Sequence, residues 1–410
     1  MNTIFCKKML IAFFMGFSCG MPLLLTISVL QAWMKEAGVD LSVIGLMALV
    51  GIPYTLKFLW APVFDRFTLC FLGRRRGWLL VSQLLLMIAI VGLGFSNPQH
   101  PVWISLAAFW VTFFSASQDI VVDAYRREDL TDSELGLGSS LYINGYRLGM
   151  LLASGGALIM ADFISFQMVY IIMAGCMLPG ILTTLLAREP EMPYGCPKTL
   201  QQAVVDPLIE YFQRNDAIWI LTFILCYKLG DTMATAMTTP FYLEIGFTKT
   251  EIGSIVKLFG FWATVFGTLT GGIMMIRIGI HRSLWIFGFF QAFSTACFAV
   301  LAQLGHSVPT LAWVVVFENL STGMGTSAYS AFMASITNKK FTATQYALLS
   351  SLMGVPRVLA SAPTGWMVKQ LGWQNFFIMC SLIAIPGMLL LLKFATWQEK
   401  PPSGTFSKCD

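Results

Sequence analysis

The sequence has few charged residues, few histidines and no paired cysteine motif, and each shortage excludes a class of protein. Lys, Arg, Asp and Glu make up 11% of the 410 residues, whereas soluble domains carry about 25%. The three histidines, His100, His281 and His306, fall in expected loops, so a histidine proton relay across a membrane is excluded. The nine cysteines are scattered through apolar stretches, which predicts small buried side chains rather than a metal site.

The sequence also lacks motifs that common enzymes and pumps require. No H-E-x-x-H zinc motif and no phosphate-binding G-x-x-x-x-G-K-[S/T] loop occurs. Gly136-Leu137-Gly138 lacks the strand-and-helix context of a nucleotide-binding fingerprint. We therefore expect no enzyme activity, no cofactor and no metal. A non-transporting membrane sensor and an intramembrane enzyme with an Asp119–Asp231 dyad are remote alternatives.

Long apolar stretches dominate what is present. Hydrophobic residues make up 56% of the chain and the mean hydropathy is +0.71. Twelve stretches approach the roughly 20 residues that a bilayer-spanning helix needs. We therefore predict an all-α integral membrane protein in contact with lipid, with twelve transmembrane helices at residues 9–33, 41–63, 77–95, 102–125, 136–161, 166–187, 217–243, 250–276, 282–303, 309–335, 343–368 and 373–395.

A polar, proline-rich gap divides these stretches into two groups of six. It predicts an N-terminal six-helix bundle over 1–190, a cytoplasmic linker over 191–216, and a C-terminal six-helix bundle with a short cytoplasmic tail over 217–410. The two groups also resemble repeats, because Gly38 recurs as Gly246 and Arg147 recurs as Arg357 at nearly the same offset. Secondary transporters often consist of two such halves, with the substrate site between them.

The basic residues set the expected orientation. Most lie in the loops on one side, including Arg74, Arg75, Arg76, Arg126, Arg127 and Arg188, whereas the other side has Lys35, Lys249 and Lys369. The positive-inside rule then places both termini in the cytoplasm. The net charge of +5 reflects this bias, and we expect no nucleic-acid partner.

Nine charged residues lie inside the expected spans. Each would cost roughly 2.5–3.5 kcal/mol at the centre of a lipid-facing helix, so they are expected to pair or to line a watery cavity. Because no histidine lies in a span, the proton-coupling candidates are the carboxyl groups of Asp119, Glu318 and Asp231. The candidates for substrate binding or gating are Gln31, Lys57, Gln118, Asp123, Tyr125, Asn144, Tyr146, Arg147, Lys228, Lys257 and Arg357.

Several of these residues have an equally good structural explanation. Asp123 and Arg147 fit a clamp between helices, and Lys57 or Lys257 fits a side chain that reaches a span end. The uncharged residues fit helix–helix hydrogen bonds. Cations slightly outnumber acids in the spans, which favours an acidic substrate.

One loop combines acidic and basic residues in a recognisable order. Asp65-Arg66 is followed by Gly73-Arg74-Arg75-Arg76, which is a topogenic loop and also resembles the loop signature of the major facilitator superfamily. That resemblance implies a cytoplasmic latch formed by Asp65, Arg66, Arg74, Arg75 and Arg76. The second half has a degenerate copy in Arg277, Gly279, His281 and Arg282.

Three stretches narrow the resemblance. Residues 20–33, 51–62 and 117–126, together with Gly145-Tyr146-Arg147, are similar to the AmpG-type muropeptide permeases, a facilitator branch that includes acetyl-CoA transporters. The resemblance implies a major facilitator fold and proton symport of anhydro-muropeptides (GlcNAc-anhydroMurNAc and its peptides) across the bacterial inner membrane for peptidoglycan recycling. It also implies support of β-lactamase induction, hence of antibiotic resistance, and puts the coupling carboxylate at Asp119. The alternative cargo is another anionic metabolite such as acetyl-CoA. We expect a monomer.

Overall fold

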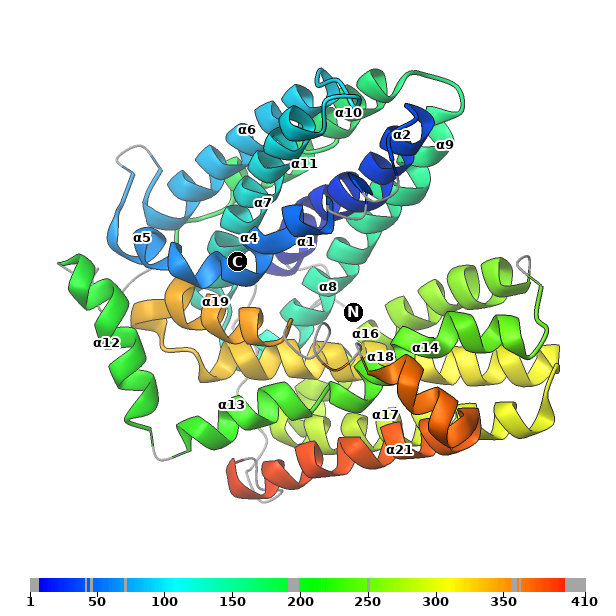
Figure 1. Ribbon diagram of the computed structural model, residues 1–410. Coiled ribbons are helices and arrows are strands. Elements are labelled where there is room, and N and C mark those ends of the chain that lie inside the picture. The colour runs from blue at the N-terminus through cyan, green and yellow to red at the C-terminus, as the bar shows by residue number, and fades with distance from the viewer. Residues whose placement is uncertain are drawn as a thin grey trace.

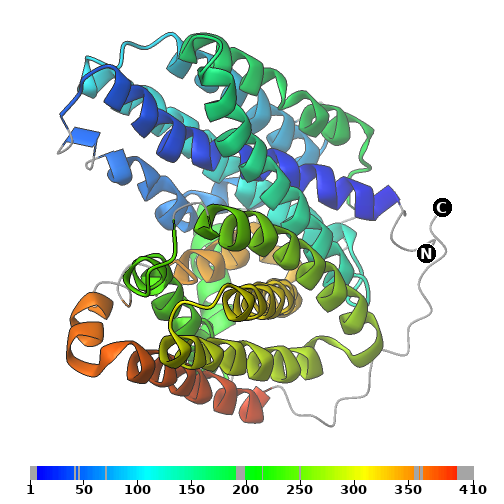
Figure 2. The same cartoon turned by 90° about the vertical axis from the view of Figure 1, so that its right-hand side faces the viewer.

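The structure is a computed structural model. It describes residues 7–40, 43–44, 47–69, 72–190, 199–214, 216–248, 251–354, 360 and 363–394. Over these residues the chain is helical, apart from turns and one isolated bridge between Leu69 and Gly73. The helices form two groups that lie one above the other in both overall views (Figures 1 and 2).

The first group contains the helices up to residue 186. They are α1 (Lys7–Leu24), η1 (Leu25–Val29), α2 (Leu30–Glu36), η2 (Met47–Gly51), α4 (Ile52–Leu56), η3 (Lys57–Leu59), α5 (Ala61–Arg66), α6 (Arg74–Gly94), α7 (Pro101–Asp129), α8 (Leu135–Leu151), η4 (Leu152–Gly156), α9 (Ala157–Ala161), α10 (Phe166–Gly175) and α11 (Leu178–Leu186).

The second group follows a separate linker helix, α12 (Leu200–Phe212). It contains α13 (Ala217–Cys226), α14 (Leu229–Glu244), η5 (Ile252–Phe259), α16 (Gly260–Ile278), α17 (Ile280–Leu304), α18 (Val308–Ile336), η6 (Lys339–Phe341), α19 (Thr342–Leu352) and α21 (Thr364–Phe394). Within α21 the chain turns at Gly372, whose φ of 74° is poorly accessible to residues with a side chain.

Each predicted apolar stretch contains helix in the described residues. Within the part of the chain that the structure describes, eight helices are long and apolar enough to cross a membrane. Four of the predicted stretches do not form such a helix in their described residues, because the helix there is too short, is interrupted or is too polar. They are 41–63, 136–161, 309–335 and 343–368. All four contain a charged residue, namely Lys57, Arg147, Glu318 and Arg357 in that order, which lowers their hydropathy.

Glycines bring α1 and α8 into backbone contact. A Cβ added to Gly20 would collide with the carbonyl oxygen of Tyr146, and one added to Gly145 would collide with that of Phe13. Small residues allow this approach in membrane helices.

The same helix contains a sequence that resembles a hydrolase motif. Gly16-Phe17-Ser18-Cys19-Gly20 matches the G-x-S-x-G spacing, but it lies inside α1 rather than at the strand-to-helix turn that this motif requires.

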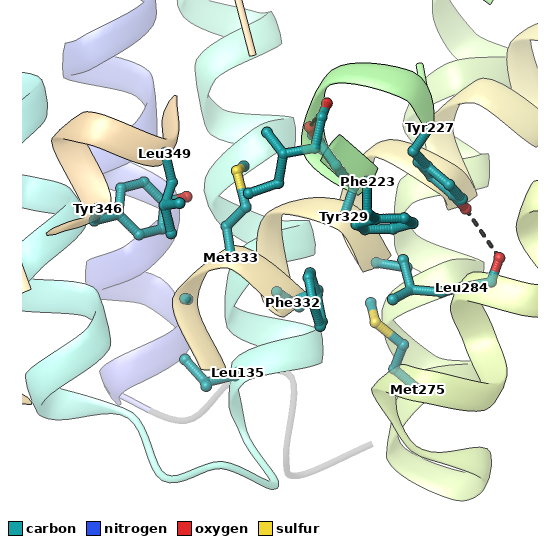
Figure 3. Packing of buried hydrophobic residues seen from close by; sticks show 14 of the residues in the cluster. Leu135, Phe223, Tyr227, Met275, Leu284, Tyr329, Phe332, Met333, Tyr346 and Leu349 are labelled. Carbon is teal, nitrogen blue, oxygen red and sulfur yellow. Dashed lines mark hydrogen bonds between the residues drawn. The ribbon is translucent and has the colours of Figure 1, made fainter. Parts of the chain in front are cut away.

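The two groups meet at one end of the molecule, which we call the basic end. Here α7 and α18 end, α19 begins, and Arg74, Arg75, Arg126 and Arg127 lie. Helix α19 contacts α5 and α7, and α12 contacts both α5 and α19, so these segments gather on one side of the molecule (Figure 1). A buried cluster containing Leu135, Met333 and Tyr346 joins the groups (Figure 3).

Candidate functional site

A row of buried charges follows α7 toward the basic end. The Nζ of Lys57, at the start of η3, lies 3.9 Å from Oδ2 of Asp123. The Nη2 of Arg126 lies 3.2 Å from Oδ1 of the same carboxylate. The exposed fractions of Lys57, Asp123 and Arg126 are only 7%, 5% and 2%. Asp123 is therefore held between two cations rather than facing a single partner.

Asp119 lies one helical turn farther from the basic end and is bound more loosely. Its carboxyl group interacts with Cys19 of α1 and with the positive charge of Lys57. Its Oδ1 has no hydrogen-bond partner among the described residues, although the side chain is buried. A buried acceptor without a partner is costly, so this oxygen is suited to hold a proton or a substrate group.

Gln118, next to Asp119, connects two helices instead. Its Nε2 donates to Oγ of Ser18 at 3.2 Å and to Sγ of Cys19 at 3.3 Å. The amide thus joins α7 to α1 and fixes the cysteine that contacts Asp119. This is the helix–helix alternative considered for the uncharged candidates.

A second group of buried charges lies in the other half of the molecule. Lys228 and Asp231 form an ion pair with 3.3 Å between Nζ and Oδ2, and Nζ also donates to Oγ1 of Thr326 at 3.0 Å. Glu318 of α18 accepts from Oγ of Ser294 at 2.5 Å. Oγ1 of Thr322 lies 3.3 Å from Oε1 of Glu318 and 3.3 Å from Oδ1 of Asp231. Both candidate carboxylates of the second half therefore occupy one cluster.

Helix α8 stands between the two groups of charges. Oδ1 of Asn144 accepts from Oγ1 of Thr268 on α16 at 2.6 Å, across the boundary between the halves. One turn later, Arg147 interacts electrostatically with Asp231. Its Nε has no hydrogen-bond partner within the part of the chain that the structure describes. Arg147 is therefore available to an anionic ligand from the first half.

The remaining candidates lie apart from these clusters or outside the described residues. Gln31 of α2 and Tyr146 of α8 are half-buried. The hydroxyl of Tyr125 donates to the carbonyl oxygen of Arg188 at 2.8 Å, a bond between α7 and the end of α11. Lys257 belongs to η5, but its side chain lies outside the described residues, as does Arg357 entirely.

One of the predicted latch residues, Asp65, lies at the start of α19. Asp65 accepts from the backbone N–H groups of Ala343 and Thr344 at 3.2 and 2.8 Å. Its Oδ1 also lies 2.7 Å from Nη2 of Arg75. A carboxylate at a helix N-terminus is favoured by the helix dipole. Asp65 of the first half therefore caps a helix of the second half.

Arg74 and Arg75 are held by an acid that the sequence did not single out. Both guanidinium groups contact Glu128 of α7, at 2.7 and 2.6 Å. Arg76 instead donates to the carbonyl oxygens of Thr184 and Leu185 at the end of α11, and Arg66 lies 4.8 Å from the ring centroid of Phe67. Of the five predicted latch residues, Asp65, Arg74 and Arg75 therefore belong to one network, whereas Arg66 and Arg76 contact other groups.

Arg126 also connects the halves, although the sequence indicated only a basic loop there. Helix α7 continues to Asp129, so Arg126 belongs to the helix rather than to a loop. Its side chain is buried in the protein. Its Nη2 donates to the hydroxyl of Tyr346 at 2.8 Å, and the guanidinium carbon lies 4.4 Å from the ring centroid of Tyr142. The signal that could have revealed this role is its spacing of three from Asp123, which places both on one helix face.

The linker helix adds a third connection at the basic end. Nε2 of Gln345, on α19, donates to the carbonyl oxygen of Pro207 at 3.1 Å and to Glu210. Nη1 of Arg214 donates to the carbonyl oxygen of Ile336 at 2.6 Å. Partial burial raises the pKa of Glu210, but the hydrogen bonds from Arg214 and Gln345 outweigh it and hold the pKa below its ordinary value.

The candidate site has buried charges in both halves, and it is closed at the basic end. The clusters around Asp119 and Asp231 lie on separate helix groups, and α8 reaches both. No cluster of His, Cys, Asp and Glu suited to a metal ion occurs among the described residues. The arrangement favours binding an anionic molecule between the halves and holding protons on carboxyl groups.

Comparison with known proteins gives consistent matches. The sequence profile of the Major Facilitator Superfamily matches residues 9–248 and 229–408. The anhydromuropeptide permease of Escherichia coli strain K12 is 45% identical over 381 residues, which cover 92% of this chain and 78% of that protein. The putative transporter AmpG 4 of Rickettsia conorii is 32% identical over 94% of this chain and 95% of that protein.

A solved structure shares the fold. The proton:xylose symporter XylE, bound to 6-bromo-6-deoxy-D-glucose, aligns with a TM-score of 0.68 and 12% identity over 96% of both chains. At that identity the likeness concerns the arrangement of the helices and not the cargo.

Proposed function

Because the chain belongs to the major facilitator superfamily, we propose that it imports anhydro-muropeptides into the cytoplasm by proton symport. The family and the shared fold confirm the prediction of an all-α, multi-pass membrane transporter with the major facilitator fold, rather than an enzyme. The observation that carries the cargo assignment is the 45% identity to an anhydromuropeptide permease over 92% of this chain. The expected role is peptidoglycan recycling, which would also supply the signal for β-lactamase induction.

The buried cations suit this cargo. A muropeptide presents peptide carboxylates together with sugar hydroxyl and amide groups. Lys57 and Arg147 of the first half and Lys228 of the second half are all placed to pair with carboxylates. Transporters with two repeated halves bind substrate between them. We therefore place the substrate between these three cations, with α8 at the centre.

Asp119 is the proposed proton carrier of the first half. Its partly unpaired carboxyl group competes with Asp123 for the positive charge of Lys57. Protonation of Asp119 would leave Lys57 free for a substrate carboxylate, whereas deprotonation would draw it back. Proton and anionic substrate would then bind together, as symport requires.

The proposed orientation puts the basic end in the cytoplasm of a bacterial inner membrane. Basic loops favour that side, and both termini would lie there. In this orientation the contacts of Asp65, Arg126 and Gln345 close the cytoplasmic side. Import would require residues 1–190 and 217–410 to rock about the site, with residues 191–216 as the linker, in a protein that we expect to act as a monomer.

Uptake of labelled anhydro-muropeptide into energised membrane vesicles tests the proposal. We expect accumulation that an uncoupler abolishes and that excess unlabelled muropeptide, but not acetyl-CoA, inhibits. Absence of uptake would rule out the cargo, and uptake that resists the uncoupler would rule out symport. Inhibition by acetyl-CoA alone would favour the alternative anionic cargo.

A further inference from the structure

Two acidic side chains of the second half lie together in the protein interior. Asp231 belongs to α14 and Glu318 to α18, and a single hydroxyl, that of Thr322, lies between their carboxyl groups. Glu318 is 8% exposed, and the side chain of Asp231 is 11% exposed. Thr322, one turn after Glu318, has its Oγ1 at 3.3 Å from Oδ1 of Asp231 and at 3.3 Å from Oε1 of Glu318.

Counting hydrogens favours a proton on this pair of carboxyl groups. The Thr322 hydroxyl has one hydrogen, so it can donate to only one of the two carboxyl groups at a time. The Ser294 hydroxyl also has one hydrogen, which either the other oxygen of Glu318 or the carbonyl oxygen of Gln291 can accept. The second carboxyl group can bond to the Thr322 oxygen only as a donor, and it can donate only when it carries a proton. Two ionised carboxylates in contact also repel each other strongly where water is scarce.

The charged and polar groups around the pair come from several helices. Lys228 neutralises Asp231, and Arg147 reaches it from α8 of the other half. Gln291 of α17 lines the same small cavity as Asp231, and its Nε2 has no hydrogen-bond partner among the described residues. The other titratable side chains described near the pair are neutral near pH 7, namely Tyr227, Tyr242 and Cys297. Lys228 therefore leaves Glu318 as the member that carries the proton.

An anionic substrate would change this balance in one direction. A substrate carboxylate that binds Arg147 or Lys228 takes positive charge away from Asp231 and brings negative charge close to the pair. Both changes favour a proton on the pair. Because coupling between two binding events is reciprocal, a proton on the pair also favours binding of the anion.

We propose that Asp231 and Glu318 form a shared-proton pair that couples proton binding to anion binding through Lys228 and Arg147. This inference rests on the proposed transport function and adds a proton site in the second half to the one at Asp119. Each half would then contribute one protonatable centre, and both centres would interact with the substrate through a neighbouring cation.

The test separates proton coupling from substrate movement, using the full chain in proteoliposomes. Accumulation driven by an imposed pH gradient requires proton release, whereas exchange of labelled for unlabelled anhydro-muropeptide at equal pH does not. Glu318→Gln mimics the protonated pair. An imposed gradient of one pH unit is a tenfold difference in proton concentration, so we expect loss of coupling to reduce gradient-driven accumulation by about tenfold or more. Exchange should remain close to that of the parent protein.

A second variant probes the pair without removing a carboxyl group. Ser294→Ala deletes the hydroxyl that stabilises ionised Glu318, so the high-pH limb of the accumulation profile should move upward by about half to one pH unit. Ser283→Ala on the same helix is the matched control. Its hydroxyl donates to the carbonyl oxygen of Gly279, four residues earlier, and its pH profile should match that of the parent.

The outcomes are distinguishable. Normal gradient-driven accumulation by Glu318→Gln overturns the shared-proton pair. Loss of both accumulation and exchange, combined with an unshifted profile in Ser294→Ala, overturns it as well, because Glu318 would then be structural. A shifted profile in Ser294→Ala supports the pair even where Glu318→Gln does not fold. Absence of uptake by the parent protein contradicts the transport proposal itself.

Discussion

At the scale of single residues, the structure separates two acids that the sequence places on the same helix face. Asp123 is enclosed by Lys57 and Arg126, whereas Asp119 retains an oxygen without a partner among the described residues. Spacing along a helix reports a shared face, but it does not report which cations approach from other helices. The different surroundings of Asp119 and Asp123 lead to different expected phenotypes.

Asp119→Asn should uncouple transport while leaving the protein folded. The amide cannot exchange a proton, so we expect uncoupler-sensitive accumulation to fall by about tenfold or more, with exchange of substrate retained. Asp123→Asn removes the shared partner of two buried cations and should instead lower stability by about 3–5 kcal/mol. Uptake assays and thermal unfolding in detergent distinguish the two. Equal unfolding temperatures for both variants would contradict the distinction.

Asp65→Asn tests the latch at the basic end. The change removes the negative charge that binds Arg75 and caps α19. We expect a loss of stability on the order of 2–3 kcal/mol and easier labelling of cysteines introduced behind the closed end. Arg66→Ala is the control, because Arg66 contacts the ring of Phe67 and not this network. Similar labelling of both variants would mean that Asp65 does not hold the end closed.

At the scale of elements, close packing of α1 on α8 depends on glycine. Gly20→Ala places a methyl group against the Tyr146 carbonyl oxygen, so the helices must separate, at a cost of about 1–3 kcal/mol. Gly92→Ala on α6 has nothing within 4 Å of the added Cβ and should stabilise the helix by about 0.5–1 kcal/mol. Thermal unfolding of the two variants should therefore shift in opposite directions. A shift in the same direction would contradict the packing argument.

The linker helix gives a prediction that depends on pH. Hydrogen bonds from Arg214 and Gln345 hold the pKa of Glu210 below its ordinary value near 4.5. A lowered pKa means that the ionised group stabilises the fold above pH 4.5 and that this contribution is lost as the pH falls through the folded value. Glu210→Gln should therefore unfold at a lower temperature than the parent at pH 7, and the difference should shrink as the pH falls below 4.5. If the difference in unfolding temperature did not depend on pH, the effect of Glu210 would come from the packing of its side chain and not from its charge.

At the scale of the whole molecule, composition and hydropathy were enough to predict a helical membrane protein, because both depend on a chain's average preference for lipid. The family was predicted from local motifs instead, at residues 20–33, 51–62 and 117–126. Repeated glycines carried part of the topology as well. Gly38 and Gly246 both adopt positive φ, at 78° and 99°, as do Gly73 and Gly279 at 91° and 81°, so equivalent turns recur in the two halves. The proposed division at residues 190 and 217 stays a prediction.

The contacts between the halves could not be predicted in the same way. Asp65 with Thr344, Arg126 with Tyr346 and Asn144 with Thr268 are each separated by more than a hundred residues. A single sequence does not relate such positions, because each residue is already compatible with the local pattern of its own helix and carries no mark of its distant partner. Arg126 shows the consequence, since a residue that looked like a loop charge for orientation is a buried contact between halves.

The proposed rocking motion requires the contact between α8 and α16 to open and close. Asn144 and Thr268 face each other across it, with 2.6 Å between their oxygen atoms. A short thiol cross-linker applied to Asn144→Cys with Thr268→Cys should trap the closed basic end and stop uptake, and reduction should restore it. Each single variant, treated in the same way and compared with its own untreated rate, should continue to transport. Because release into the cytoplasm requires the halves to part at this contact, continued uptake by the cross-linked protein would contradict the rocking motion.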